Sequence, residues 1–211
     1  MATTTDLTEK YISEHPSIKD CIKYDIINYS KLARKIAKEL GIEKQSSIEA
    51  ILVAARRYAE KIRIKDNLEK KIMDILRRSE LEIRNKIIVA IVDKNVYIEQ
   101  LIDLEKEVRQ KADIFYTMEG TGVFTIITTE KNLEKLIKLF GKHIVRLKRD
   151  LAMIIVKSPE AVEETPGVLA YLYSIFGEHG INIVETMSCW TDTFFVISEK
   201  DVIKILKFFK F

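Results

Sequence analysis

The sequence predicts an α+β protein in which an all-helical N-terminal part precedes two ferredoxin-like sandwiches. Apolar residues recur at helical spacing up to about residue 84. A continuous run of mostly β-branched residues then begins at Ile87, as in a buried strand. From there the order of elements reads βαββαβ and starts again after about 65 residues, which indicates a tandem repeat. Right-handed crossovers with helices on one face make each copy an α/β sandwich.

The N-terminal part divides into a polar tail over residues 1–16 and a helical domain over residues 17–84. We expect Ser30 to cap one helix that Gly41 ends, and Ser46 or Ser47 to cap the next. Glu49 lies three residues after Ser46, as in a capping box. A fourth helix is expected within residues 67–84, on apolar positions that repeat with helical period, namely Leu68, Ile72, Ile75 and Leu76.

The first sandwich is expected over residues 85–150 and the second over 151–211. In the first, the pattern predicts strands at 87–92, 112–118, 123–128 and 143–148, with helices around 101–108 and 133–140. In the second, it predicts strands at 151–156, 181–189 and 193–198, with helices at 166–179 and 199–207. The sequence ends at Phe211, so the second copy lacks a full last strand, of which 208–211 could be a stub. We therefore expect an edge of that sheet to be open, or completed by another segment or subunit.

Composition bounds the class of protein. Charged residues make up 32% and hydrophobic residues 47% of the 211 residues, which is typical of a globular chain. We expect no transmembrane helix and no signal peptide, and hence a cytoplasmic protein. Two distant cysteines, expected to be free and buried, and three scattered histidines predict no metal site and no cofactor. Abundant Lys, Ile and Glu with scarce Gln hint at a thermophilic source.

Charge is distributed unevenly along the chain. Residues 17–84 carry 17 Lys and Arg against 11 Asp and Glu, a net charge of +6, whereas residues 85–211 carry 17 against 18. A basic N-terminal third followed by a neutral remainder suggests a module that faces a polyanion, joined to a module of another kind.

The most informative motif is the segment Thr165-Pro166-Gly167-Val168-Leu169. Pro166 suits the first turn of a helix, because its φ is fixed and it lacks an N–H. Gly167 allows a neighbour or a ligand to approach the backbone closely. The free amides of such a helix start form a ready site for a carboxylate. We expected the loop before this helix to lie beside the start of the next strand, and so to bring Glu163, Glu164, Thr165 and Gly167 near Asn182.

Three segments of residues 151–211 resemble an ACT domain, the small regulatory module that binds amino acids in aspartate kinase, phosphoglycerate dehydrogenase and related enzymes. They are the Thr165–Leu169 segment, Gly180-Ile181-Asn182-Ile183, and Thr193-Phe194-Phe195-Val196-Ile197 with Asp201 after it. Over residues 85–150 only the order of elements and the hydrophobic pattern agree, and the corresponding loop reads Asp93-Lys94-Asn95-Val96 without Pro-Gly. The resemblance implies a free amino acid or similar small zwitterion as ligand, contacts from loop amides and an Asn such as Asn182, and pairing of ACT domains in a homodimer or higher oligomer.

The candidate ligand-binding residues are therefore Glu163, Glu164, Thr165, Pro166, Gly167, Val168, Asn182, Ile183, Met187 and Ser188. Each also has an ordinary structural interpretation. The Pro-Gly segment could be a plain helix start, Asn182 could bond its own backbone, and adjacent acids in a polar loop could simply be solvated.

The N-terminal helices resemble a helix-turn-helix or winged-helix unit, formed by residues 30–40, Gly41 and residues 46–58. Candidate nucleic-acid contacts, with double-stranded DNA as the partner, are Lys31, Lys35, Gln45, Ser46, Arg56 and Arg57. Glu49 would face phosphates near the point of closest approach and the basic residues come late, so a structural helical bundle is the alternative.

The sequence contains no phosphate-binding loop, no dinucleotide fingerprint, no nucleophile elbow and no metal-ligand spacing, so we expect no enzyme activity. Two functions follow. The first is an amino-acid-sensing regulator, a transcription factor in which ligand at an ACT interface controls binding to DNA, with RNA as an alternative partner. The second is a non-catalytic regulatory subunit that docks on a biosynthetic enzyme. An exposed apolar stripe within 67–84 would favour the second, and its burial within the chain would count against it.

Overall fold

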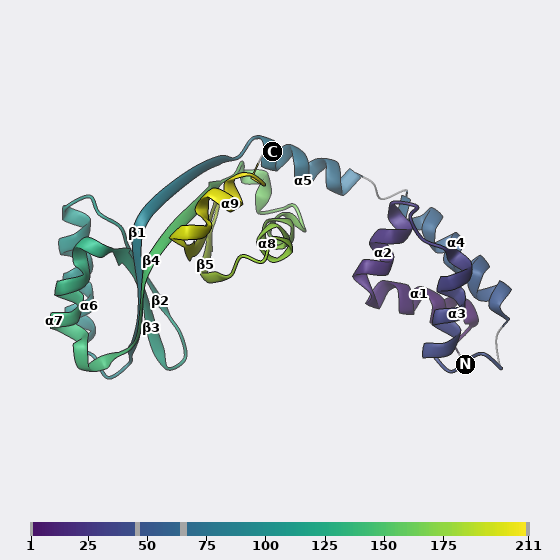
Figure 1. Cartoon of the computed structure of the whole chain (residues 1–211), viewed down its shortest axis with the longest axis horizontal. Coiled ribbons are helices and arrows are strands. Elements are labelled where there is room, and N and C mark those ends of the chain that lie inside the picture. The colour runs from purple at the N-terminus through teal and green to yellow at the C-terminus, as the bar shows by residue number, and fades with distance from the viewer. Residues whose placement is uncertain (1, 45–46, 64–66, 210–211) are drawn as a thin grey trace. The chain divides into compact units, whose positions relative to one another are not determined.

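The computed structural model describes residues 2–44, 47–63 and 67–209, which form two compact units (Figure 1). The first unit covers residues 1–70 and the second covers residues 71–211. The sequence placed the change of domain at residue 85, whereas the compact units meet at residues 70 and 71.

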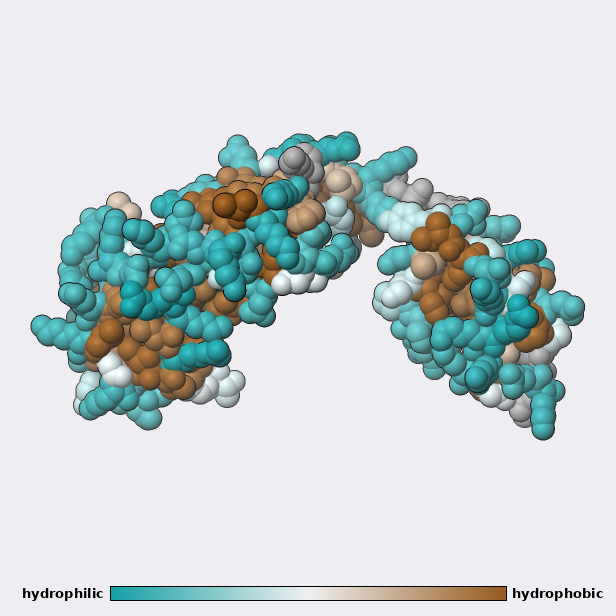
Figure 2. All heavy atoms as spheres, viewed as in Figure 1, coloured by the Kyte–Doolittle hydropathy of each residue, from teal (hydrophilic) through white to brown (hydrophobic). Residues whose placement is uncertain are grey.

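The first unit contains the helices α1 (Thr4–Glu14), α2 (Pro16–Lys23), α3 (Tyr29–Glu39) and α4 (Ile48–Arg63). Their apolar faces share one core, which includes Ile12 of α1, Ile22 of α2, Ile36 of α3 and Ile51 of α4, all with no exposed surface. Several large hydrophobic side chains of this unit remain exposed, and Figure 2 shows hydrophobic residues gathered on its visible face. The exposed side chains of the first unit include Ile26, Ile48, Val53 and Leu68.

Two predictions for this unit were wrong in detail. Most of the predicted polar tail is the helix α1, because Thr3 and Asp6 form a capping box that starts the helix, and Tyr11 on that helix is buried in the core. The helix α3 is capped by Asn28, whose side chain accepts a hydrogen bond from the Lys31 amide at 3.0 Å, rather than by Ser30. Ser47 caps α4, since its Oγ accepts from the Ala50 amide at 3.0 Å. Ser46, the other predicted cap, lies outside the described residues.

The helix α5 (Asn67–Arg77) is shorter than predicted, because a strand begins at Glu80 and not at Ile87. Its residues Ile72, Ile75 and Leu76 belong to the core of the second unit, where they are 8%, 3% and 0% exposed. The apolar stripe that the sequence indicated on this helix is therefore packed within the chain, apart from Leu68, which is 42% exposed.

One antiparallel six-stranded sheet organises the second unit, in the order β2-β3-β1-β4-β6-β5. Its strands are β1 (Glu80–Asp93), β2 (Phe115–Glu119), β3 (Val123–Thr129), β4 (Ile144–Lys157), β5 (Ile183–Cys189) and β6 (Asp192–Ser198). The two predicted copies are thus halves of a single curled sheet and not separate sandwiches. The strands expected at 143–148 and 151–156 are one strand of 14 residues, β4.

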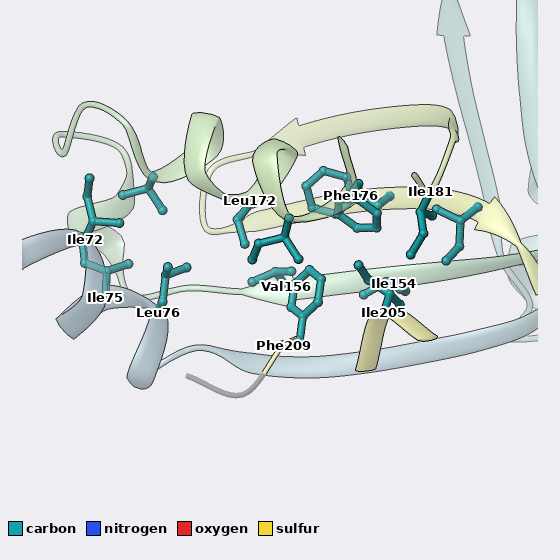
Figure 3. Close-up of a cluster of buried hydrophobic side chains, with 14 residues drawn as sticks. Ile72, Ile75, Leu76, Ile154, Val156, Leu172, Phe176, Ile181, Ile205 and Phe209 are labelled. Carbon is teal, nitrogen blue, oxygen red and sulfur yellow. The ribbon is translucent and has the colours of Figure 1, made fainter. Parts of the chain in front are cut away.

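The helices follow the predicted order within each half. In the first half, α6 (Ile98–Gln110) and α7 (Leu133–Phe140) pack on β1 and β3 through a core that includes Leu104, Leu136 and Ile126. In the second half, α8 (Val168–Glu178), α9 (Val202–Leu206) and α5 pack on β4 and β6 through the core shown in Figure 3. The two halves thus each have a helical layer and a core of their own.

The long strands β1 and β4 pass from one half to the other at two irregularities. Lys86 on β1 and Asp150 on β4 both have left-handed backbones, with φ of 55° and 56°. The pairing of β1 with β4 shifts register between Arg84 and Ile87. Such bulges bend a strand and increase its twist, which curls the sheet. The helix-free faces of the two halves share a further core, in which the rings of Tyr116 and Phe194 lie 5.1 Å apart.

The strand that the second copy lacks is supplied by the start of β1. Residues Glu80–Arg84 pair with Lys157–Met153 of β4, on the side of β4 opposite to β6. The second half therefore has four strands, with the N-terminal end of β1 where a last strand would lie. This confirms completion by another segment of the chain. The alternative, a strand after α9, is absent from the described residues through Phe209.

Candidate functional site

The predicted ligand loop joins β4 to α8 over residues 158–167. It begins at Ser158, whose backbone N–H donates to the Thr191 carbonyl at 2.9 Å, and passes through a short 3-10 turn at Glu160–Val162. It ends at Gly167, whose backbone is left-handed with φ of 92°. The helix α8 starts at Val168, so Pro166 precedes the helix. The prediction that Pro166 occupies the first turn was wrong. No side chain caps this helix start.

The helix α5 lies against this loop. A Cβ atom added to Gly167 would lie 3.1 Å from Cδ1 of Ile72, so the glycine accommodates a side chain of the protein itself. Figure 3 shows Ile72, Ile75 and Leu76 projecting from α5 toward the core that contains Leu172 of α8. Just after α5, Ser79 Oγ donates to Ser158 Oγ at 3.0 Å. The close approach that Gly167 permits is therefore used, at least in part, by helix packing.

An open groove of about 350 Å³ remains between α5 and the loop. On one side it is lined by Lys71, Asp74 and Ile75 of α5 and by Arg78, which directly follows the helix, and on the other side by Ala161, Glu164 and Thr165 of the loop. Two cations and two carboxylates thus surround a cavity large enough for a small molecule. We call it the α5 groove.

The charges of the α5 groove are accessible. One guanidinium nitrogen of Arg78 lies 3.4 Å from a carboxylate oxygen of Asp74, and the two side chains are 64% and 65% exposed. An exposed pair of this kind contributes little to stability, at most about 1 kcal/mol, so a ligand can compete for either partner at low cost. Glu164 is also exposed. The arrangement can receive a carboxylate at Arg78 and an ammonium group at Glu164, which are the two ends of a zwitterion.

Six of the predicted ligand residues are contiguous in this loop and its junction with α8. Glu163, Glu164, Pro166 and Gly167 are exposed and Thr165 is half-buried, but Val168 is only 1% exposed and belongs to the core. Of these, Glu164 and Thr165 line the α5 groove.

Asn182 does not lie near Gly167, contrary to our expectation. The strand β5 begins beside the end of β6, since Ile183 pairs with Ile197, and Ile197 pairs with Ala152 near the middle of β4. The loop instead follows Lys157, at the other end of these pairings. The helix α8 carries the chain back along the sheet for 11 residues, or about 16 Å. Asn182 and Ile183 are therefore at the opposite end of the sheet from the loop.

Met187 and Ser188 are closer to the loop, at the end of β5. Ser188 pairs with Thr193 of β6, which pairs with Val156 of β4. Met187 packs into the core on the helix-free face, so it points away from α8. Ser188, by contrast, lies at the loop end of the sheet and is exposed.

The corresponding loop of the first half is occupied by its own side chains. Asp93 accepts the Asn95 N–H at 2.8 Å, and His143 Nδ1 lies 3.2 Å from both of its carboxylate oxygens. The hydrogen bond from Asn95, followed by that from His143, lowers the pKa of Asp93. Lys94 pairs with Glu119 at 2.6 Å. These contacts organise the loop internally, in keeping with its lack of Pro-Gly.

Sequence reasoning missed the contribution of α5 to the site. Lys71 and Asp74 lie three residues apart on one face of α5, next to the buried Ile72 and Ile75, and Arg78, the residue after the helix, follows Asp74 at a spacing of four. The stripe of charge was visible in the sequence. That it faces the loop, and not solvent alone, depends on tertiary packing.

The candidate nucleic-acid residues are spread over α3 and α4. Lys31, Lys35, Arg56 and Arg57 are all exposed. Lys35 pairs with Glu39, and the Arg56 guanidinium lies 5.8 Å from the centre of the Tyr29 ring. Gln45 and Ser46 lie outside the described residues.

Within the residues that the structure describes, no helix is long and apolar enough to cross a membrane, and no cluster of three potential metal ligands occurs. Both cysteines are free. The prediction that they are buried was wrong, because Cys189 is exposed and Cys21 is half-buried.

Comparison with known proteins gives matches at the level of structure alone. No family model and no curated protein matches the chain. Among solved structures, aspartate kinase from Clostridium acetobutylicum, described as an allosteric enzyme, matches 60% of this chain with a TM-score of 0.50 and 11% identity. The regulatory subunit of aspartate kinase from Thermus flavus matches 62% of this chain and 94% of its own length, with a TM-score of 0.48 and 12% identity. A Vibrio cholerae protein of unknown function, described as a possible transport protein, matches 67% of this chain and 95% of its own, with a TM-score of 0.48 and 14% identity.

Over 60% of its length the chain shares its fold with part of the Clostridium aspartate kinase. It spans about a third of the length of the Clostridium enzyme. At 11% identity the likeness concerns the fold, and does not transfer a ligand, an activity or a partner.

Proposed function

We propose that this chain is a non-catalytic regulatory protein that binds a free amino acid in the α5 groove. The observation that supports it is the presence of both cations and carboxylates around a cavity of about 350 Å³ at the loop end of an ACT-like half-sheet. Arg78 and Lys71 would receive the α-carboxylate, and Glu164 and Asp74 the α-ammonium. The remaining wall, at Ile75, Ala161 and Thr165, would contact the ligand side chain.

Such a ligand would regulate by holding α5 in place. One wall of the groove is α5 and the other is the loop, so a bound zwitterion contacts both and stabilises their docked arrangement. A ligand shifts a conformational equilibrium only by its difference in affinity between the two states. Undocking of α5 would take Arg78 away from Glu164, and this separation supplies the difference.

A thermal-shift screen of the twenty amino acids tests the proposal. A ligand that binds only the folded state raises the melting temperature, and at 100 times its Kd it adds about 2.7 kcal/mol to the stability. We expect the shift to be lost in Arg78→Gln and in Glu164→Gln. Both side chains are exposed, so these variants should keep the fold.

Asn182→Ala is the matched control. Asn182 is also exposed and polar, but it lies at the opposite end of the sheet, so its replacement should leave the shift unchanged. Loss of the shift in Asn182→Ala with retention in both groove variants would refute the α5 groove as the site. Absence of a shift with all twenty amino acids would refute the function.

We propose that the first unit delivers the response, with double-stranded DNA as the partner. The exposed cations Lys31, Arg56 and Arg57 on α3 and α4 support this, together with the net charge of +3 over residues 1–70, from 14 Lys and Arg against 11 Asp and Glu. Retention on duplex DNA that falls steeply as salt rises is the expected result. Arg57→Glu should weaken retention at every salt concentration, and absence of binding at low salt would exclude DNA.

The second candidate is docking on a biosynthetic enzyme. It is favoured by the exposed apolar side chains Ile48 and Val53 on α4, which are 37% and 46% exposed, and by the exposed Glu49 at the start of that helix. Burial of Ile72, Ile75 and Leu76 removes the stripe on α5 as a docking surface. Val53→Gln should weaken an enzyme complex and leave DNA retention unchanged, so the pair of variants separates the two partners.

We also propose that the chain forms a homodimer, or a larger oligomer, through its ACT-like unit. β2 and β5 are the outer strands of the sheet, and outer strands are the natural place for pairing between copies. Light scattering of the purified chain would give the mass, and a monomer at all concentrations would refute pairing.

A further inference from the structure

A second groove of about 380 Å³ lies in the first half of the sheet, at the place where β3 ends. The ladder between β1 and β3 stops at the pair Ile87 and Thr129, so β1 before Ile87 continues with β4 alone. The groove lies against this uncovered stretch of β1. It is lined by Ile83, Arg84, Asn85, Lys86, Asp113, Ile114, Thr129, Glu130 and Lys131, and shares no residue with the α5 groove.

Asp113 is a carboxylate held in one orientation at this groove. Its Oδ1 accepts the Ile114 N–H at 2.9 Å, and its Oδ2 accepts the Thr129 hydroxyl at 2.6 Å and the Asn132 amide at 3.0 Å. Although partial burial opposes ionisation, these hydrogen bonds prevail and lower the pKa of Asp113. A carboxylate has about four acceptor positions, so these three bonds leave capacity for one more donor.

The cations of the groove are only partly compensated. Arg84 pairs with Glu82, and Arg149 pairs with Glu130. Within the described part of the chain, Lys86 and Lys131 form no ion pair, and Lys131 is close enough to Asp113 to help lower its pKa. Counted over its lining, the groove has three cations, Arg84, Lys86 and Lys131, and two carboxylates, Asp113 and Glu130, a net charge of +1.

The conformation of Lys86 also needs a reason. Its φ of 55° is in the left-handed region, where a glycine would be less strained. The bulge explains the backbone but not the choice of lysine. The presence of a cationic side chain at a strained position on the rim of a cavity is consistent with a function for that side chain.

We propose that this groove binds an acidic amino acid, whose two carboxylates meet Lys86 and Lys131 and whose ammonium group meets Asp113. An acidic amino acid has a net charge of −1, which complements the net charge of the groove. Ile83 and Ile114 contact the methylene groups between its charged ends. The first half of the sheet thereby has a ligand site, at the end opposite to its self-filled Asp93 loop.

Isothermal titration of the full chain with L-glutamate, L-aspartate and succinate tests this site. We expect at least one of the two amino acids to bind, and succinate to bind about tenfold more weakly or not at all, because it lacks the ammonium group that Asp113 receives. Equal binding of succinate would overturn the role of Asp113 and with it the proposal.

Lys86→Gly is the decisive variant because its effects on stability and on binding should have opposite signs. Glycine relieves the left-handed strain, so the melting temperature should stay the same or rise, while affinity for the acidic amino acid should fall about tenfold or more. Unchanged affinity in Lys86→Gly would overturn the proposal, and this result cannot be attributed to misfolding.

Arg78→Gln separates this site from the α5 groove. Loss of acidic amino acid binding in Lys86→Gly and its retention in Arg78→Gln would support the present proposal, even if the α5 groove binds nothing. The reverse pattern would overturn it and leave the proposed function standing.

Discussion

Gly167→Ala tests whether α5 is packed against the ligand loop as tightly as the structure shows. Alanine at φ of 92° is strained, and a left-handed conformation costs an L-residue about 1–2 kcal/mol. The new Cβ would also lie 3.1 Å from Cδ1 of Ile72, so that one side chain or the helix must shift. We add only about 0.5–1 kcal/mol for this crowding, at or below the lower limit of the roughly 1–3 kcal/mol of overpacked sites, because Cδ1 is the far end of a flexible side chain. The expected loss of stability is therefore about 1.5–3 kcal/mol.

Gly180→Ala provides the matched control. Gly180 also has a positive φ, of 62°, and also lies at an end of α8, but nothing is within 4 Å of its added Cβ. Its replacement carries the backbone cost without the crowding. Urea unfolding followed by the fluorescence of Trp190, the single tryptophan, reports on the second unit, to which both glycines belong.

Ile72→Val completes a double-mutant cycle with Gly167→Ala. The valine removes Cδ1, the atom nearest the added Cβ, so the cost of Gly167→Ala should fall by about 0.5–1 kcal/mol in the Ile72→Val background. A coupling energy of zero, together with equal costs for Gly167→Ala and Gly180→Ala, would refute the packing of α5 on the loop.

Three further predictions concern stability. Leu76→Ala should cost about 2–5 kcal/mol in urea unfolding, because Leu76 is fully buried in the core that it shares with α8. Leu68→Ala on the same helix should cost under about 1 kcal/mol, because Leu68 is largely exposed. Similar costs for the two variants would contradict the packing of α5. Burial, and then the hydrogen bond to Glu39, raise the pKa of Tyr11 from an ordinary 10 to about 12. The stability that neutral Tyr11 contributes is therefore complete below pH 10 and should be lost as pH rises to about 12. Tyr11→Phe should remove this pH dependence from unfolding curves measured in alkali. Hydrogen bonds from Lys135 and then Lys111 lower the pKa of Glu107 to about 2. The contribution of ionised Glu107 to folding stability is therefore present above pH 4.5 and lost as pH falls toward 2. Glu107→Gln should make stability less dependent on pH over that interval in acid unfolding curves.

The order of elements in the second unit could be predicted from local pattern. Runs of β-branched residues such as Ile87–Val92 and helical repeats such as Leu133–Phe140 each exclude water from one face, and that requirement depends on sequence spacing alone. It was equally evident that residues 151–211 hold only three of the four strands of a second βαββαβ copy. Which segment would supply the fourth strand was not evident, because residues 80–84 alternate charged and apolar side chains after a helix, and only pairing with β4 makes them a strand.

The position of the candidate ligand loop in the fold was predicted in part, and its ligand binding stays a prediction. The loop at 163–167 and its acidic residues lie where the sequence indicated, but Asn182 was placed at the wrong end of the sheet. The error came from topology, because consecutive strands joined by a helix run parallel, so the loop after the first strand lies at the end of the second and not at its start. The cations of α5 were missed because a helix far away in the sequence has no local signature for the surface it will cover.

The sequence by itself determined the helices, the strands, their order and the uneven charge, because each depends on side-chain polarity and spacing over a few residues. Tertiary structure alone decided that two copies share one curled sheet, that β1 completes the second half, and that Ile72 packs against Gly167 while Lys71, Asp74 and Arg78 face Glu164. These features join residues about 65 to 95 positions apart, where many alternative pairings would bury similar apolar surface and only the packed fold selects among them.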